Sequence, residues 1–221
     1  VSTLNYFYLG SGHDDPVDLY LAISNRITAN RFTIGGWNCA DTVYLGPTNA
    51  LHVNQITFGG DVPSSGQINN GAMVMRFRAG LSNPSLIIRG SNGTGRANMI
   101  VGMGGNQNGL NTSTLDLSGG NVDALIGTLI IGQGYPSGSQ GGEGRGTMTI
   151  VAGSVDATNV TVGYTATGTQ SNNPAKGFLN LQGTGIFGAD VLTLSDQMGS
   201  AVATGTVNLA GGTLKAAVMQ K

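Results

Sequence analysis

The sequence has little cysteine and little charge, and each shortage excludes a class of protein. The single cysteine, Cys39, cannot form an internal disulfide or a cysteine-based zinc site. Charged residues make up 10% of the chain and the formal net charge is -1, so the electrostatics do not favour nucleic acid or an anionic membrane as a partner. No apolar run approaches the roughly 20 residues of a membrane-spanning helix. We therefore expect no nucleic-acid partner and no membrane-spanning segment.

Short sequence motifs that mark catalytic, nucleotide-binding or metal-binding sites are also missing. The chain contains no G-x-S-x-G nucleophile elbow, no P-loop and no H-E-x-x-H zinc motif. The calcium-binding nonapeptide G-G-x-G-x-D-x-U-x is absent as well. The sequence therefore predicts a protein without a cofactor that is not an enzyme.

Two polar clusters keep a cation site open as an alternative. Asp123 and Asp156 occupy the "VDA" of two similar segments, so we expect them to stack facing outward, where two carboxylates can share a cation or a proton. The plainer interpretation is a pair of solvated turn residues. The second cluster is His13 with Asp14, Asp15 and Asp18 in "SGHDDPVDLY", which is either a cation site or a solvated loop.

Glycine is what the sequence has in excess, with 38 residues, while 39% of the chain is hydrophobic. A glycine inside a helix costs about 1 kcal/mol relative to alanine, so this composition disfavours helices. The hydrophobic fraction is too high for a disordered chain of low net charge. The composition is typical of many short strands joined by glycine-rich turns.

The chain repeats itself. "LYLAISNRITANRFTIG" (19–35) aligns with "VYLGPTNALHVNQITFG" (43–59) at a constant offset of 24 residues. Each repeat has three apolar pieces with alternating inward and outward residues, the pattern of β-strands. The first piece begins seven times, at residues 19, 43, 75, 115, 148, 179 and 207. Stacked repeats bury their apolar faces against one another.

These patterns predict an all-β fold, a right-handed parallel β-solenoid (β-helix) of about seven coils with three short strands each. The longest insertions, 133–146, 164–177 and 195–205, separate successive repeats, so we expect the loops at one corner. Residues 1–221 form one domain, with irregular, aromatic-rich coils in 1–110 and regular glycine-rich repeats in 111–221. The residues predicted to be buried are Val155, Val160, Val162, Leu179, Leu181, Leu192 and Leu194.

In segments 115–132, 146–163, 177–195 and 205–217 the chain resembles the autotransporter-associated β-strand repeat and related glycine-rich repeats of large bacterial surface proteins. Residues 1–110 match only in the skeleton of the repeat. The resemblance implies a secreted, extracellular or cell-surface passenger domain that forms a stalk and is often adhesive. The favoured hypothesis is a structural segment. The alternatives are an adhesin that binds cell-surface glycans and, less favoured, a polysaccharide lyase or hydrolase on a β-helix.

Aromatic and basic residues mark a candidate contact surface. By register Tyr20 and Tyr44 share one outward column, which suits either a contact surface or plain strand stabilisation. Arg76 and Arg78 also point outward, in a stretch without any acidic residue from 62 to 115. They form either an anion-binding or partner-binding patch, or the charged edge that keeps a sheet soluble.

The ends of the sequence suggest self-association. Residues 4–10 have the pattern of a third strand, whereas the last repeat, 207–217, is followed by only four residues where a third strand is expected. The two ends are then complementary, which predicts a head-to-tail homopolymer. Its contacts would be Tyr6, Phe7 and Tyr8 at one end and Leu214, Ala216 and Val218 at the other. The competing interpretation is continuity with further repeats of a longer solenoid.

Overall fold

The computed structural model describes residues 4–10, 15–35, 38, 40–59, 71–106, 109–135 and 141–221. These residues form β-strands and contain no helix, and all of the strand pairs are parallel. The strands are β1 (Leu4–Leu9), β2 (Asp18–Tyr20), β3 (Ser24–Ile34), β4 (Thr42–Leu45), β5 (Thr48–Gly59), β6 (Gly71–Phe77), β7 (Ser85–Arg89), β8 (Ala97–Met103), β9 (Leu110–Gln133), β10 (Glu143–Thr165), β11 (Ala175–Gln197) and β12 (Ala203–Gln220). The predicted all-β class is confirmed.

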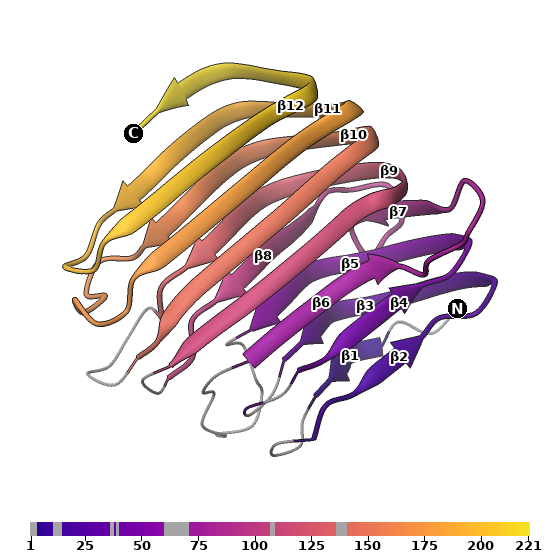
Figure 1. Ribbon diagram of the computed structural model, residues 1–221, viewed down its shortest axis with the longest axis horizontal. Helices are drawn as coiled ribbons and strands as arrows, with labels where there is room; N and C mark the ends of the chain where they lie inside the picture. Colours follow the sequence, from indigo (N-terminus) through magenta and orange to yellow (C-terminus); the bar gives the residue numbers. More distant parts are fainter. Residues whose placement is uncertain are drawn as a thin grey trace.

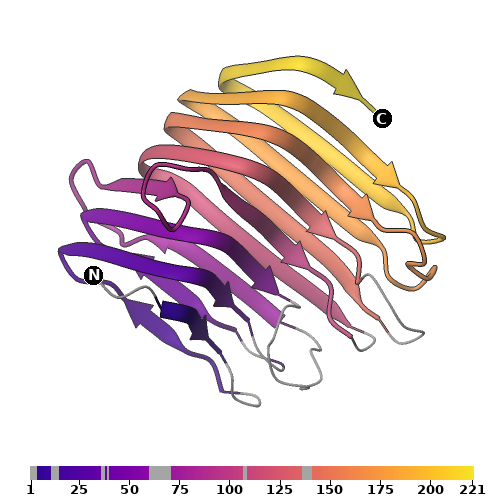
Figure 2. The ribbon, with the colours of Figure 1, turned by 180° about the vertical axis from the view of Figure 1, so that it is seen from behind.

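The strands follow one another across a continuous sheet. Its main order is β1-β3-β5-β7-β9-β10-β11-β12, and β2, β4 and β6 form a second path that also joins β9. Figure 1 shows β9 to β12 lying side by side as long ribbons that bend along their length, and Figure 2 shows the same stacking from behind. β1 and β12 lie at opposite ends of this stack.

The register of the sheet follows the repeats in the sequence. The residues that open the seven repeats pair one with the next in a single unbroken column. This column is Leu19, Val43, Met75, Leu115, Met148, Leu179 and Val207. The offset of 24 residues between the first two repeats also holds throughout the pairing of β3 with β5. Equivalent residues therefore lie on top of one another, which is the geometry that parallel strands of similar sequence favour.

Side chains that alternate inward from every strand make one apolar core. Of the seven residues predicted to be buried, six are at most 1% exposed, and the exception is Leu194, which is half-buried. The pairing of β12 with β11 ends at Gln220 opposite Thr193. No paired residue of β12 therefore covers Leu194, and this explains its exposure.

The expectation of three short strands per repeat is wrong for the C-terminal half. There each repeat is a single strand, of 24, 23, 23 and 18 residues in β9 to β12. The strands turn corners at local irregularities of the ladder, such as the register shift between Ile150 and Ala152, which absorb the bend. Gly153 lies beside this shift with a φ of 87°, a conformation that favours glycine.

The prediction of loops at a single corner also needs correction. The repeat that holds β6, β7 and β8 has two further connections, residues 78–84 and 90–96, at corners where other repeats continue almost directly. The connection from β4 to β5, for comparison, is only Gly46 and Pro47. The two added connections carry arginines, and they build the sites described below.

Glycines lie near the starts of three strands, where the backbone of another strand approaches closely. Gly146, Gly177 and Gly205 pair with one another near the starts of β10, β11 and β12. A Cβ atom on Gly177 would overlap the carbonyl oxygen of Ile131, and the other two glycines face equivalent backbone oxygens. The repeated glycine of the sequence is therefore required by backbone packing at these positions.

Candidate functional site

An exposed stack of two tyrosines and one arginine lies near the N-terminal end of the sheet. Tyr20 pairs with Tyr44, and Tyr44 pairs with Arg76, so the predicted outward column is confirmed. The tyrosine ring centroids are 4.4 Å apart with an interplanar angle of 8°. The Arg76 guanidinium lies 5.1 Å from the Tyr44 centroid, and its Nη2 donates a hydrogen bond of 3.3 Å to the Tyr44 hydroxyl. This hydrogen bond raises the pKa of Arg76.

Arg78 lies beside this stack, at a surface hollow of about 340 Å³. The hollow is lined by Tyr44, Arg76, Arg78 and Asp116, together with the turn that follows β6. The idea that Arg76 and Arg78 protect a sheet edge is wrong, because β6 is paired on both sides, with β4 and with β9. The interpretation as a contact patch remains.

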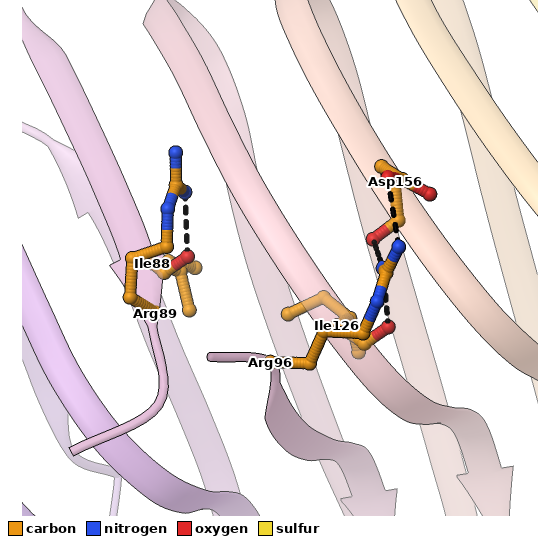
Figure 3. Close-up of polar contacts among 5 residues, drawn as sticks. All are labelled: Ile88, Arg89, Arg96, Ile126 and Asp156. Atoms are coloured by element: carbon orange, nitrogen blue, oxygen red, sulfur yellow. Dashed lines mark hydrogen bonds and ion pairs between the residues drawn. The ribbon is translucent and has the colours of Figure 1, made fainter. Parts of the chain in front are cut away.

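Two other arginines, Arg89 and Arg96, bind groups on neighbouring strands and are called clamps; Figure 3 shows the contacts of Arg96 and the bond of Arg89 to Ile88. Arg89 donates to the carbonyl oxygens of Ile88 and Asp123 and forms an ion pair of 2.6 Å with the Asp123 carboxylate. Arg96 reaches further, because it donates to the carbonyl oxygens of Ile126, at 3.0 Å, and Asp156, at 2.7 Å. Its Nη2 also lies 2.9 Å from the Asp156 carboxylate. Arg96, the residue just before β8, thereby joins the connection 90–96 to both β9 and β10.

The expected stacking of Asp123 on Asp156 is wrong. Asp123 pairs with Ser154, and Asp156 pairs with Leu125, because the register shifts by two residues between Ile150 and Ala152. Each carboxylate instead forms an ion pair with an arginine: Asp123 pairs with Arg89 at the end of β7, and Asp156 pairs with Arg96 at the end of the connection 90–96. These two acidic residues therefore have a structural partner and do not form a shared cation site.

Replacing Arg96 with methionine is expected to lower the free energy of unfolding by about 1–2 kcal/mol, since it removes two charged hydrogen bonds to carbonyls and a partly exposed ion pair. Asp156→Asn keeps the carbonyl acceptor of residue 156, so about 0.5 kcal/mol is expected. Urea unfolding of both variants and of the double variant measures the coupling. An Arg96→Met protein that unfolds at the same urea concentration as the parent would contradict the clamp.

His52 joins the arginines of this surface. It is half-buried and pairs with Thr28 and Arg89, and its Nδ1 lies 3.0 Å from Nη2 of Arg26. Burial lowers the pKa of His52, and the charges of Arg26 and Arg89 lower it further. The neutral imidazole therefore accepts the Arg26 hydrogen bond.

The predicted cation cluster is described only in part. His13 and Asp14 lie outside the described residues, while Asp15 and Asp18 are exposed. No group of three histidine, cysteine, aspartate or glutamate side chains that would suit a metal occurs in the described part of the chain. The buried carboxylate nearby is Asp41, which accepts a hydrogen bond of 3.0 Å from the Val17 amide. Burial raises the pKa of Asp41.

The two ends of the sheet carry the predicted contact residues. Tyr6 is 47% exposed, Tyr8 is half-buried, and Phe7 turns inward, where its ring stacks on Phe32 at 5.0 Å. At the other end Val218 is 48% exposed, whereas Leu214 and Ala216 pack partly buried against the core. The inward residues at both ends are thus only half covered.

The predicted complementarity of the two ends is wrong in one respect. Residues 218–220 pair with residues 191–193 of β11, so the last repeat does have a short third segment. Three residues were too few for the sequence pattern to indicate a strand, but the β11 ladder already positions them. The third-strand position of the last repeat is therefore occupied.

Sequence reasoning missed the clamps and the buried carboxylate. Arg96 and Asp156 are 60 residues apart, and no local motif links them. The only signal was that residues 62–115 contain arginines but no acidic residue. Acidic partners for these arginines therefore had to come from other repeats. Asp41 gave no signal, since a single aspartate before a strand is most often exposed.

Comparison of the chain with protein-family models, with curated proteins and with solved structures finds no match. The described residues include no helix that is long and apolar enough to cross a membrane. Proposals about function therefore depend on the geometry of this chain.

Proposed function

We propose that this chain is a structural segment of a secreted or cell-surface bacterial protein. In this proposal it is a right-handed β-solenoid of seven coils that stacks head to tail with further molecules into an extracellular stalk or fibre. The register supports the solenoid, because seven equivalent residues form one column from Leu19 to Val207. The right hand follows the general rule for parallel strands joined by crossover connections. Seven coils would span about 35 Å at the usual strand spacing.

The observation that carries the proposal is that both ends of the sheet are open. Among the described residues β1 pairs only with β3, and β12 pairs only with β11. Leu4 is 50% exposed at one end, and Leu209 is 59% exposed at the other. Unpaired edges with exposed apolar residues favour the addition of further strands.

The register defines how two molecules would stack. Suppose that β2 of one molecule pairs with the part of β12 that holds Val207 in another molecule. β1 lies one level below β3 in the stack, so it then falls at the level of the last repeat and must take the position that residues 218–220 occupy. β1 is the longer of the two segments, since it pairs at five residues with β3, whereas residues 218–220 pair at three with β11, so β1 offers the longer ladder at that position. We therefore propose that β1 displaces residues 218–220 when the stack grows.

Sedimentation velocity and electron microscopy of the 1–221 chain test this proposal. We expect rods that lengthen with protein concentration. Removing residues 218–221 frees the position for β1 and should lengthen the rods further. Tyr6→Lys should shorten them, because it places a charge at the junction, whereas Asn159→Lys adds the same charge at an exposed position in the middle of the stack and should change nothing.

A stable monomer at high concentration, both for the parent chain and for the shortened chain, would overturn the head-to-tail stack. Rods that form in the parent and shorten when residues 218–221 are removed would overturn the exchange, because that result requires the last segment to be part of the contact.

A further inference from the structure

Four arginines lie in the repeat that holds β6, β7 and β8, and three of them have partners. Arg76 binds Tyr44, Arg89 binds Asp123, and Arg96 binds Asp156. Arg78 differs, since its Nε is buried and has no hydrogen-bond partner among the described residues. A buried donor without a partner is costly, and this sets Arg78 apart from the other three.

Arg78 is half-buried and also lines the surface hollow. It opens the connection 78–84, which is longer than the two residues that join β4 to β5. Its backbone amide donates to the carbonyl oxygen of Leu45 at 3.1 Å, which fixes the start of the connection against β4. The connection then forms one wall of the hollow of about 340 Å³, a volume within the usual range of ligand pockets, about 300–1,000 Å³.

The other polar groups of the hollow define what fits there. The Tyr44 hydroxyl accepts from Arg76 and is also hydrogen-bonded to Tyr20, so it is already engaged within the stack. Asp116 accepts from the Ser118 amide through Oδ1 at 3.0 Å, which leaves its second oxygen to accept from a ligand hydroxyl. Two guanidinium groups against one carboxylate leave a net charge of +1 in the hollow.

We propose that the hollow binds a small carboxylate that also carries hydroxyl groups, the chemistry of a uronic acid residue. A guanidinium fork matches a planar carboxylate, which would contact Arg78, while the ligand hydroxyls would donate to Asp116. The Asp116 carboxylate disfavours a dianion such as sulfate. Stacking of a sugar on Tyr44 is excluded, because Tyr20 covers one face of its ring and Arg76 the other. This binding role goes beyond the structural function and does not depend on the stacking of molecules.

Isothermal titration of the 1–221 chain with D-glucuronate tests the site, with D-glucose and sodium sulfate as comparison ligands. We expect saturable binding of glucuronate and none of glucose. Arg78→Gln should weaken binding about tenfold or more, and Arg78→Lys should also weaken it because the fork is lost. Lys215→Gln removes the same charge from an exposed position outside the hollow and should bind like the parent.

Asp116→Asn gives a second readout that does not touch the arginines. It should weaken glucuronate binding and strengthen sulfate binding, because the acceptor for hydroxyls is lost and the hollow becomes more positive. Thermal melts check that each variant is folded. The proposal is overturned if the parent does not bind glucuronate saturably, if Arg78→Gln binds it as tightly as the parent, or if sulfate and glucuronate bind the parent equally.

Discussion

Replacement of Val162 by aspartate is expected to lower the free energy of unfolding by about 4 kcal/mol or more. Val162 is fully buried in the third part of β10 and pairs with Ile131 on one side and Leu194 on the other. The change removes about 1.5–3 kcal/mol of apolar burial and places a charge without a partner in the core. Chemical denaturation followed by circular dichroism measures the loss.

The matched control for this charge is Asn159→Asp on the same strand. Asn159 is exposed, three residues before Val162, so the new carboxylate stays in water and the stability should change by less than about 0.5 kcal/mol. If Val162→Asp unfolded at the same denaturant concentration as Asn159→Asp, the inward register of β10 would be wrong.

Replacement of Gly177 by alanine is expected to cost about 3 kcal/mol. The added methyl group would overlap the Ile131 carbonyl oxygen and approach the amide of Gly163 and a methyl group of Val162. Two of these three neighbours are backbone atoms in paired strands, which cannot move without breaking the ladder. Thermal unfolding of the variant should show the loss as a lower midpoint.

Gly188 provides the control on the same strand, β11. A Cβ atom there meets only the Val155 carbonyl oxygen, at 3.8 Å, an ordinary contact. Gly188→Ala should therefore be neutral or slightly stabilising, because alanine has less backbone freedom to lose on folding. Equal losses from the two alanine variants would show that close backbone packing is not the reason for the glycine at position 177.

The prediction of alternating faces depended on local pattern alone and was reliable where the repeats align. The sequence placed Tyr20 above Tyr44 and Leu19 above Val43, and both pairs are present. A strand has a side-chain period of two, and parallel strands of similar sequence pair equivalent residues. Inward and outward positions therefore follow from the order of residues without knowledge of the corners.

The corners were decided only by the tertiary structure. The register shift between Ile150 and Ala152 separates Asp123 from Asp156, although their local sequences match. A glycine-rich corner can bend in several ways, and the number of residues it absorbs depends on the packing of the core on both sides. The sequence pattern cannot supply that number.

The sequence by itself determined that this protein is all-β, which residues face the core in most repeats, and which tyrosines share an outward column. The tertiary structure decided the partners of the arginines, the short final segment at 218–220 and the hollow beside Arg78. The physical reason is the separation in sequence of the residues that interact. Alternation is set by neighbouring residues, whereas Arg96 meets Asp156 across 60 residues, and only the stacking of the repeats brings those two side chains together.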